Sequence, residues 1–147
     1  MSSFAITRET YYGALWTLLR GIDASPVIRL FDRRLRAVER LPDAELPALF
    51  MIVGKQDTVW KGKLPQHKLT AEIVLACANP DPHTAADIVM NALVDAVEAA
   101  LDPGPGLEWE TLGGLVSQCR IEGEAEFFPG PNSTRAYAAL TIAMMIP

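Results

Sequence analysis

The sequence contains few of the residues that usually catalyse reactions or bind metals. Its 147 residues include two cysteines and two histidines, and aromatic residues make up 7% of the chain. Cys77 and Cys119 stand in apolar segments, so we expect buried, reduced thiols rather than a disulfide framework. His67 and His83 are far apart in sequence and lack metal-ligand spacing, and we expect both at the surface. We therefore expect no metal site and no cofactor.

Enzyme motifs are also lacking. The sequence contains neither of the two glycine-rich phosphate-binding loops, no C-x-x-C, and no G-x-S-x-G. A nucleophilic cysteine would have to be Cys77 or Cys119, and a thiol in apolar surroundings is usually inert. We therefore predict no catalytic residue. The alternative is a small cytoplasmic enzyme or ligand-binding domain that uses one of these cysteines.

Long hydrophobic runs are missing as well. No apolar stretch approaches the roughly 18 residues of a membrane span, so we expect no membrane partner. The N-terminal segment lacks a basic region followed by an apolar one, and we expect no signal peptide. Yet half of the residues are apolar, and the mean hydropathy is +0.15. This composition excludes a disordered chain and suggests that another subunit covers part of the surface.

Charge is distributed unevenly along the chain. Residues 1–75 carry 11 Lys and Arg against 8 Asp and Glu, whereas residues 76–147 carry 2 against 10. A chain with one basic and one acidic half can place opposite charges face to face in a head-to-tail assembly. The alternative is that both are solvated surfaces of a monomer.

Two segments have helical periodicity. Residues 7–22 place apolar side chains at helical spacing. Residues 83–101 form the clearest element, with Thr84 as the expected N-cap. The polar residues of this second helix form one narrow stripe, which consists of Asp87, Asn91, Asp95, Glu98 and Asp102. Because the rest of the helix is apolar, several neighbouring elements must cover it, and the stripe itself is most simply a solvated face.

Strand-like segments account for most of the remaining chain. We predict strands over residues 31–38, 47–53, 69–78, 115–128 and 134–146. Residues 56–65 are expected to form a hairpin tip or an extended loop, and Gly123 suggests a bulge in the fourth strand. The last two strands should pair antiparallel. The order α-β-β-β-α-β-β predicts an α+β fold, a mixed and largely antiparallel sheet packed by two helices, in one domain over residues 1–147.

Two basic features are candidates for contact surfaces. The first is a cluster of five arginines, Arg29, Arg33, Arg34, Arg36 and Arg40. Because the chain is acidic overall and no aromatic residues alternate with these arginines, a salt-bridged face or an acidic neighbour fits better than nucleic acid. The second is Trp60, which lies close to Lys61 and Lys63. Exposed tryptophan is a favoured interface anchor, although Trp60 could also fold back onto its own domain.

Short motifs along nearly the whole chain suggest a family. They are Leu18-Leu19-Arg20-Gly21-Ile22, Arg33-Arg34-Leu35, Leu46-Pro47-Ala48-Leu49-Phe50, Trp60-Lys61-Gly62-Lys63-Leu64, Asn91-Ala92-Leu93-Val94-Asp95-Ala96, Leu112-Gly113-Gly114-Leu115-Val116 and the closing Ile146-Pro147. In these motifs and in segment order, the sequence resembles the tail terminator proteins of long-tailed bacteriophages, the minor tail protein U type.

The resemblance implies a non-enzymatic virion protein, assembled in the bacterial cytoplasm and placed at the head-proximal end of the tail. Such a subunit forms a hexameric ring that caps the tail tube protein, stops tube polymerisation and presents a surface to head or neck connector proteins. DNA passes through the lumen without specific binding. Tail completion proteins and head–tail connectors share this size and layout, so either is an alternative.

A closed ring needs two different complementary patches on each subunit. We hypothesise that the five arginines include one patch, and that Asp87, Asp95, Glu98 and Asp102 form the other. Charge reversal at Arg33 and Arg36 should then weaken the rings. The acidic residues could instead line the lumen and repel DNA. Trp60, Lys61 and Lys63 are candidates for contact with the tail tube or with a neighbouring subunit.

Overall fold

A computed structural model describes residues 6–78, 85–129 and 135–146. Two helices and five strands follow the predicted order. They are α1 (Arg8–Arg20), β1 (Leu30–Asp32), β2 (Ala48–Lys61), β3 (Leu64–Ala78), α2 (Ala86–Ala100), β4 (Gln118–Pro129) and β5 (Arg135–Ile146). Two short 3₁₀ turns, η1 (Val38–Arg40) and η2 (Asp43–Glu45), lie between β1 and β2. The predicted α+β class is confirmed.

The five strands form one sheet in the order β1-β2-β3-β5-β4. Only the short β1 runs parallel to its neighbour, and the other pairings are antiparallel, including the predicted pairing of β4 with β5. The predicted bulge in β4 is confirmed, since the register with β5 shifts between Glu122 and Glu126 and Gly123 has a φ of 74°.

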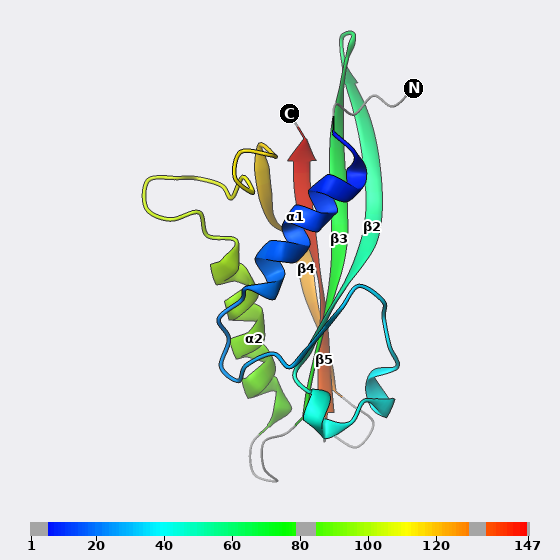
Figure 1. Ribbon diagram of the computed structural model, residues 1–147, viewed down its shortest axis with the longest axis vertical. Coiled ribbons are helices and arrows are strands. Elements are labelled where there is room, and N and C mark those ends of the chain that lie inside the picture. The colour runs from blue at the N-terminus through cyan, green and yellow to red at the C-terminus, as the bar shows by residue number, and fades with distance from the viewer. Residues whose placement is uncertain (1–5, 79–84, 130–134, 147) are drawn as a thin grey trace.

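Both helices pack on the same face of this sheet, where α1 crosses in front of the strands and α2 lies beside it (Figure 1). Alternate residues of β3, among them Leu69, Ile73 and Leu75, point into this core and are almost fully buried. From α1, Tyr12 and Leu15 meet them, and the hydroxyl of Tyr12 donates a hydrogen bond of 2.8 Å to the carbonyl oxygen of Thr70.

The opposite face of the sheet is covered at one end by the segment between β1 and β2. Val38, Leu41 and Leu46 of this segment pack on Phe50 and Ala76 in a second, smaller core. Farther along, the same face carries polar side chains, such as Glu72, whose carboxylate accepts a hydrogen bond from the hydroxyl of Thr141. The sheet is therefore layered by helices on one face and partly open on the other.

The predicted strand over residues 31–38 is largely wrong. Strand β1 ends at Asp32, because the Asp32 carboxylate accepts a hydrogen bond of 2.8 Å from the backbone N–H of Arg34 and turns the chain away from the sheet. Val38, at the far end of the predicted strand, begins η1 instead.

The segment over residues 56–65 forms the end of a hairpin, the first of the two predicted alternatives, and most of its residues belong to two long strands rather than to an extended loop. Lys61 pairs with Leu64, and the two-residue turn between them has Gly62 at a φ of 64°. The resulting β2–β3 hairpin extends beyond the rest of the sheet (Figure 1). Helix α2 begins at Ala86, with Ala85 as its N-cap residue, whereas Thr84 and His83 lie outside the described residues.

Candidate interaction surfaces

The arginine segment, defined here as residues 33–40, leaves the sheet directly after β1. Asp32 organises its start, because the Asp32 carboxylate binds Arg36 at 3.0 Å and lies 3.6 Å from the guanidinium of Arg34. The backbone N–H of Arg34 and the two guanidinium groups hold the pKa of Asp32 below its usual range. The side chain of Arg34 nevertheless stays 84% exposed. Part of the positive charge of this segment is therefore available to a partner.

Two of the predicted interface arginines are engaged within the subunit. Arg33 forms an ion pair with Glu9 of α1, and Arg36 also lies 3.9 Å from Glu45 of η2. The hydrogen bond from Arg33 lowers the pKa of Glu9. Arg33 and Arg36 therefore help to hold α1 and η2 against the segment that carries these arginines.

The other two arginines are exposed but do not share one location. Arg40 lies in η1, within the arginine segment. Arg29 precedes β1 and lines a cavity of about 250 Å³ together with Asp43 and with Val89 of α2. Among the described residues, neither side chain has an ion-pair partner. The cluster predicted from the sequence is thus divided between two places.

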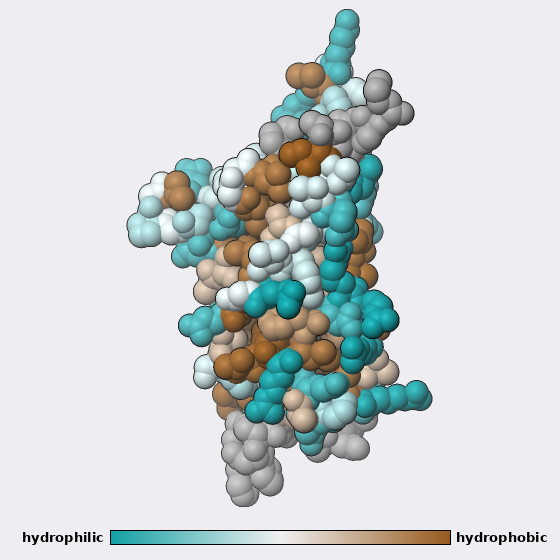
Figure 2. All heavy atoms as spheres, viewed as in Figure 1, coloured by the Kyte–Doolittle hydropathy of each residue, from teal (hydrophilic) through white to brown (hydrophobic). Residues whose placement is uncertain are grey.

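The acidic stripe of α2 is exposed along its whole length. Asp87, Asp95, Glu98 and Asp102 all point to solvent, and α2 has no basic residue in its last turn. In Figure 1, α2 forms the left side of the molecule, while the arginine segment lies on the right at a similar level along the long axis. Figure 2 shows hydrophilic residues gathered down that right side. The arginine segment and helix α2, which carries the exposed acidic stripe, therefore lie on opposite sides of the subunit.

The tip of the β2–β3 hairpin is a third exposed surface. The side chain of Trp60 is 62% exposed, so Trp60 does not fold back onto its own core. Val59 and Leu64 are exposed on the opposite face of the hairpin, and Lys61 and Lys63 have no ion-pair partner among the described residues. Figure 2 shows hydrophilic and hydrophobic residues mixed on this projection. We call residues 59–64 the hairpin tip.

An acidic groove, which the sequence analysis did not find, lies where α2 ends beside β4. This groove, of about 280 Å³, is lined by Glu98, Leu101, Asp102, Pro103, Glu108, Trp109, Glu110, Cys119, Arg120 and Ile121. The guanidinium carbon of Arg120 lies 4.8 Å from the centre of the Trp109 ring, in a cation–π contact. The sequence signal was Trp109 between two glutamates, but their proximity to α2 depends on the fold.

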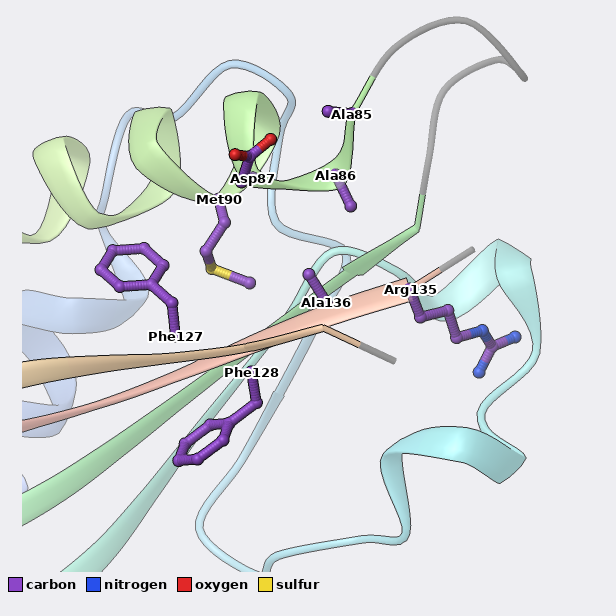
Figure 3. Close-up of a pocket in the computed structure, with 8 residues that line it drawn as sticks. All are labelled: Ala85, Ala86, Asp87, Met90, Phe127, Phe128, Arg135 and Ala136. Atoms are coloured by element: carbon purple, nitrogen blue, oxygen red, sulfur yellow. The ribbon is translucent and has the colours of Figure 1, made fainter. Parts of the chain in front are cut away.

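An apolar cavity of about 390 Å³ lies near the start of α2. Figure 3 shows Phe127 of β4 pointing toward Met90 of α2, whereas Phe128 lies on the other side of its strand. Arg135 points away from the cavity and binds the carbonyl oxygen of Val38 and the carboxylate of Asp43. The lining therefore presents apolar walls and the single carboxylate of Asp87, without the paired polar groups that chemistry or orientation of a ligand requires.

The thiols are buried as predicted. Cys77 and Cys119 are each 1% exposed, and burial raises the pKa of Cys77 to about 11 and that of Cys119 to about 12. Both thiols are therefore protonated at neutral pH, a state in which they are poor nucleophiles.

The described residues offer no other candidate for catalysis or metal binding. His67 is buried, contrary to the prediction, because it faces the helices beside Thr58, whose hydroxyl lies 3.0 Å from His67 Nδ1. Within residues 6–78, 85–129 and 135–146, no group of His, Cys, Asp and Glu is placed to hold a metal ion. In the same part of the chain, no helix has the length and apolarity to cross a membrane.

Comparison with known proteins shows a likeness in fold. No family model and no curated protein matches the sequence. Among solved structures, the fold is similar to a chain from a structure described as "Virion of native gene transfer agent (GTA) particle". That match has a TM-score of 0.52 and 15% sequence identity, and it covers 91% of this chain and 92% of the other. At this identity, the likeness establishes a shared fold over nearly the whole chain.

Proposed function

We propose that this protein is a structural subunit of a phage-like virion and assembles head to tail into a closed ring. The observation that carries the proposal is the placement of the arginine segment and of the helix with the exposed acidic stripe on opposite sides of the same subunit. A heterologous contact between two such surfaces generates a ring when the rotation closes. The fold likeness to a chain of a gene transfer agent virion supports the same class of protein.

Within that class, we propose the role of tail terminator. The hexameric ring would cap the tail tube at its head-proximal end, stop polymerisation of the tube protein and present a surface to connector proteins of the head or neck. DNA would pass through its centre without specific binding. The sequence resemblance supports this role, as does an exposed hairpin tip that projects from the sheet. A connector or a tail completion protein would use the same surfaces at another position in the particle.

A catalytic role has less support. An enzyme that used Cys77 or Cys119 would need a thiolate that a substrate can reach, whereas both thiols are buried and their pKa values lie far above neutral. Among the described residues that line the apolar cavity beside α2, no nucleophile lies next to a general base. Exposed surfaces, rather than a pocket, are the features that this subunit offers.

The test of the ring is its assembly in solution. We expect light scattering of the concentrated protein to show a concentration-dependent oligomer, and negative-stain images to show closed rings with an open centre. A strict monomer at every concentration would contradict the proposal.

The polarity of the contact is tested by charge reversal at arginines that have little role inside the subunit. Arg34→Glu with Arg40→Glu should weaken the ring, because both side chains are exposed. Mixing this variant with Asp87→Arg/Asp95→Arg should restore mixed assemblies, because both aspartates are exposed in the acidic stripe. Lys55→Glu, an exposed charge on β2 outside the arginine segment, is the matched control. Unchanged assembly of the arginine variant would exclude this pairing of surfaces.

A further inference from the structure

We propose that the hairpin tip of one subunit docks into the acidic groove of the neighbouring subunit. The inference rests on the ring proposed above and adds a second contact to the same interface. It also assigns Trp60 a partner, namely another copy of this chain rather than the tail tube.

The hairpin tip has the character of an anchor. Trp60 is exposed on one face of the hairpin tip, beside its cross-strand partner Pro65, and Val59 and Leu64 are exposed on the other face, on a projection that the helices do not cover. An exposed tryptophan is a typical anchor at interface centres, where burial of its ring contributes strongly to binding. Lys61 and Lys63 add two positive charges, so the complementary surface should combine apolar walls with carboxylates.

The acidic groove has this combination. Its apolar lining comes from Leu101, Trp109 and Ile121. Trp109 is 39% exposed, and one side of its ring is in contact with the guanidinium of Arg120, the basic side chain among the described lining residues. Within the described residues, the carboxylates of Glu98 and Glu108 have no hydrogen-bond or ion-pair partner. Neither is therefore committed to a contact inside the subunit.

Negative charge is concentrated at the C-terminal end of α2, where a cation would be stabilising. Glu98 and Asp102 are like charges four residues apart, at the helix end where the macrodipole is negative. The last turn of α2 contains no basic residue to offset them. Arg120 lines the same groove but contacts the Trp109 ring and forms no ion pair with these carboxylates among the described residues, so a lysine from a neighbour would add to their stabilisation.

The two surfaces cannot meet within one subunit but are placed to meet in a ring. In Figure 1, the hairpin rises on the upper right, and the loop that follows α2 lies on the upper left. The arginine segment and the acidic stripe occupy the lower right and the lower left. The hairpin tip lies nearer the end of the long axis than the groove does, so the proposed head-to-tail contact requires neighbouring subunits to be inclined to each other.

Disulfide cross-linking tests the contact directly. The variant Lys63→Cys/Glu108→Cys should form, on mild oxidation, a ladder of covalent oligomers on a non-reducing gel. Cys77 and Cys119 are buried and do not compete. The control is Lys63→Cys/Val27→Cys, since Val27 is 72% exposed at a different place, and it should give at most low yields of dimer. A ladder that is no stronger than in the control would overturn the inference.

Binding measurements separate this inference from the ring itself. Trp60→Ala should raise the dissociation constant of the ring by about tenfold or more, the usual effect of truncating a central tryptophan. Val27→Ala should leave it unchanged. If rings form in the wild type and persist equally in Trp60→Ala, the hairpin contacts something else, and the ring proposal survives. If the wild type forms no ring, both proposals fail.

Discussion

Arg33 binds Glu9, joining the segment after β1 to the first turn of α1. A second contact of this pair, from Arg33 Nη2 to Glu9 Oε2, measures 3.3 Å. The pair fixes the position of α1 near the edge of β2, where Arg8 also donates a hydrogen bond of 2.8 Å to Gln56. A residue that the sequence presents as part of an interface thus has a defined role inside the subunit.

Reversing one charge of this pair should destabilise the subunit, and reversing both should restore it. We expect Arg33→Glu to lower the free energy of unfolding by up to ~1 kcal/mol, since the pair is partly exposed and is screened by solvent. Adding Glu9→Arg should recover most of the loss. Thermal or urea unfolding of both variants measures the effect, and a double variant no more stable than Arg33→Glu would contradict it.

Low pH should reduce the contribution that the Arg33–Glu9 pair makes to the free energy of unfolding. The pKa of Glu9 is lower in the folded chain than its ordinary value of 4.5, mainly through the hydrogen bond from Arg33. A lowered carboxylate pKa means that its stabilisation is fully present above the unfolded value and is lost as the pH falls through the folded one. Arg33→Met removes this linkage. Between pH 6 and pH 3, its free energy of unfolding should therefore fall less than that of the wild type, as measured by urea unfolding at each pH.

Gly54 should not tolerate a side chain. A methyl group at this position would lie 2.6 Å from Thr70 Oγ1, which is held by a hydrogen bond to the carbonyl oxygen of Lys55. We expect Gly54→Ala to cost ~1–3 kcal/mol of stability, as overpacking usually does. Gly13→Ala is the control, because nothing lies within 4 Å and alanine favours the interior of α1 by ~1 kcal/mol. If both variants unfold at the same temperature, the proposed crowding is absent.

The two native thiols should react with iodoacetamide only when the protein unfolds. Their burial and their pKa values near 11 and 12 leave almost no accessible thiolate at pH 8. Mass spectrometry after timed alkylation should show unmodified Cys77 and Cys119 in the native protein and full labelling in guanidinium chloride. Rapid labelling of the native protein would instead favour the enzyme alternative.

The parts of the fold that could be predicted are those with strong local signals. The narrow polar stripe on an otherwise apolar segment led to the correct helix α2, and Gly123 led to the correct bulge in β4. The strand over residues 31–38 was wrong because branched side chains favour a strand only where a partner strand is present. Here the chain turns away from β2 after Asp32, and its apolar residues pack on Phe50 from η1 instead.

The long hairpin was underestimated for a related reason. Beyond the bulge near Gly54, both faces of β2 are exposed, so the sequence loses the alternation of apolar and polar residues that reveals a strand. For the candidate surfaces, the sequence identified the acidic stripe and Trp60. It did not reveal that Arg33 is engaged by Glu9, or that Trp109 lies beside the end of α2.

The sequence by itself determined the class of fold, the order of the elements, the burial of both thiols and the division of charge between two halves of the chain. These properties follow from composition and from hydrophobic periodicity, which can be read within short stretches of the sequence. Only the tertiary structure decided which charged side chains form ion pairs inside the subunit and which remain exposed to solvent. That choice depends on contacts between residues far apart in the chain, as between Arg33 and Glu9, and no local pattern encodes it.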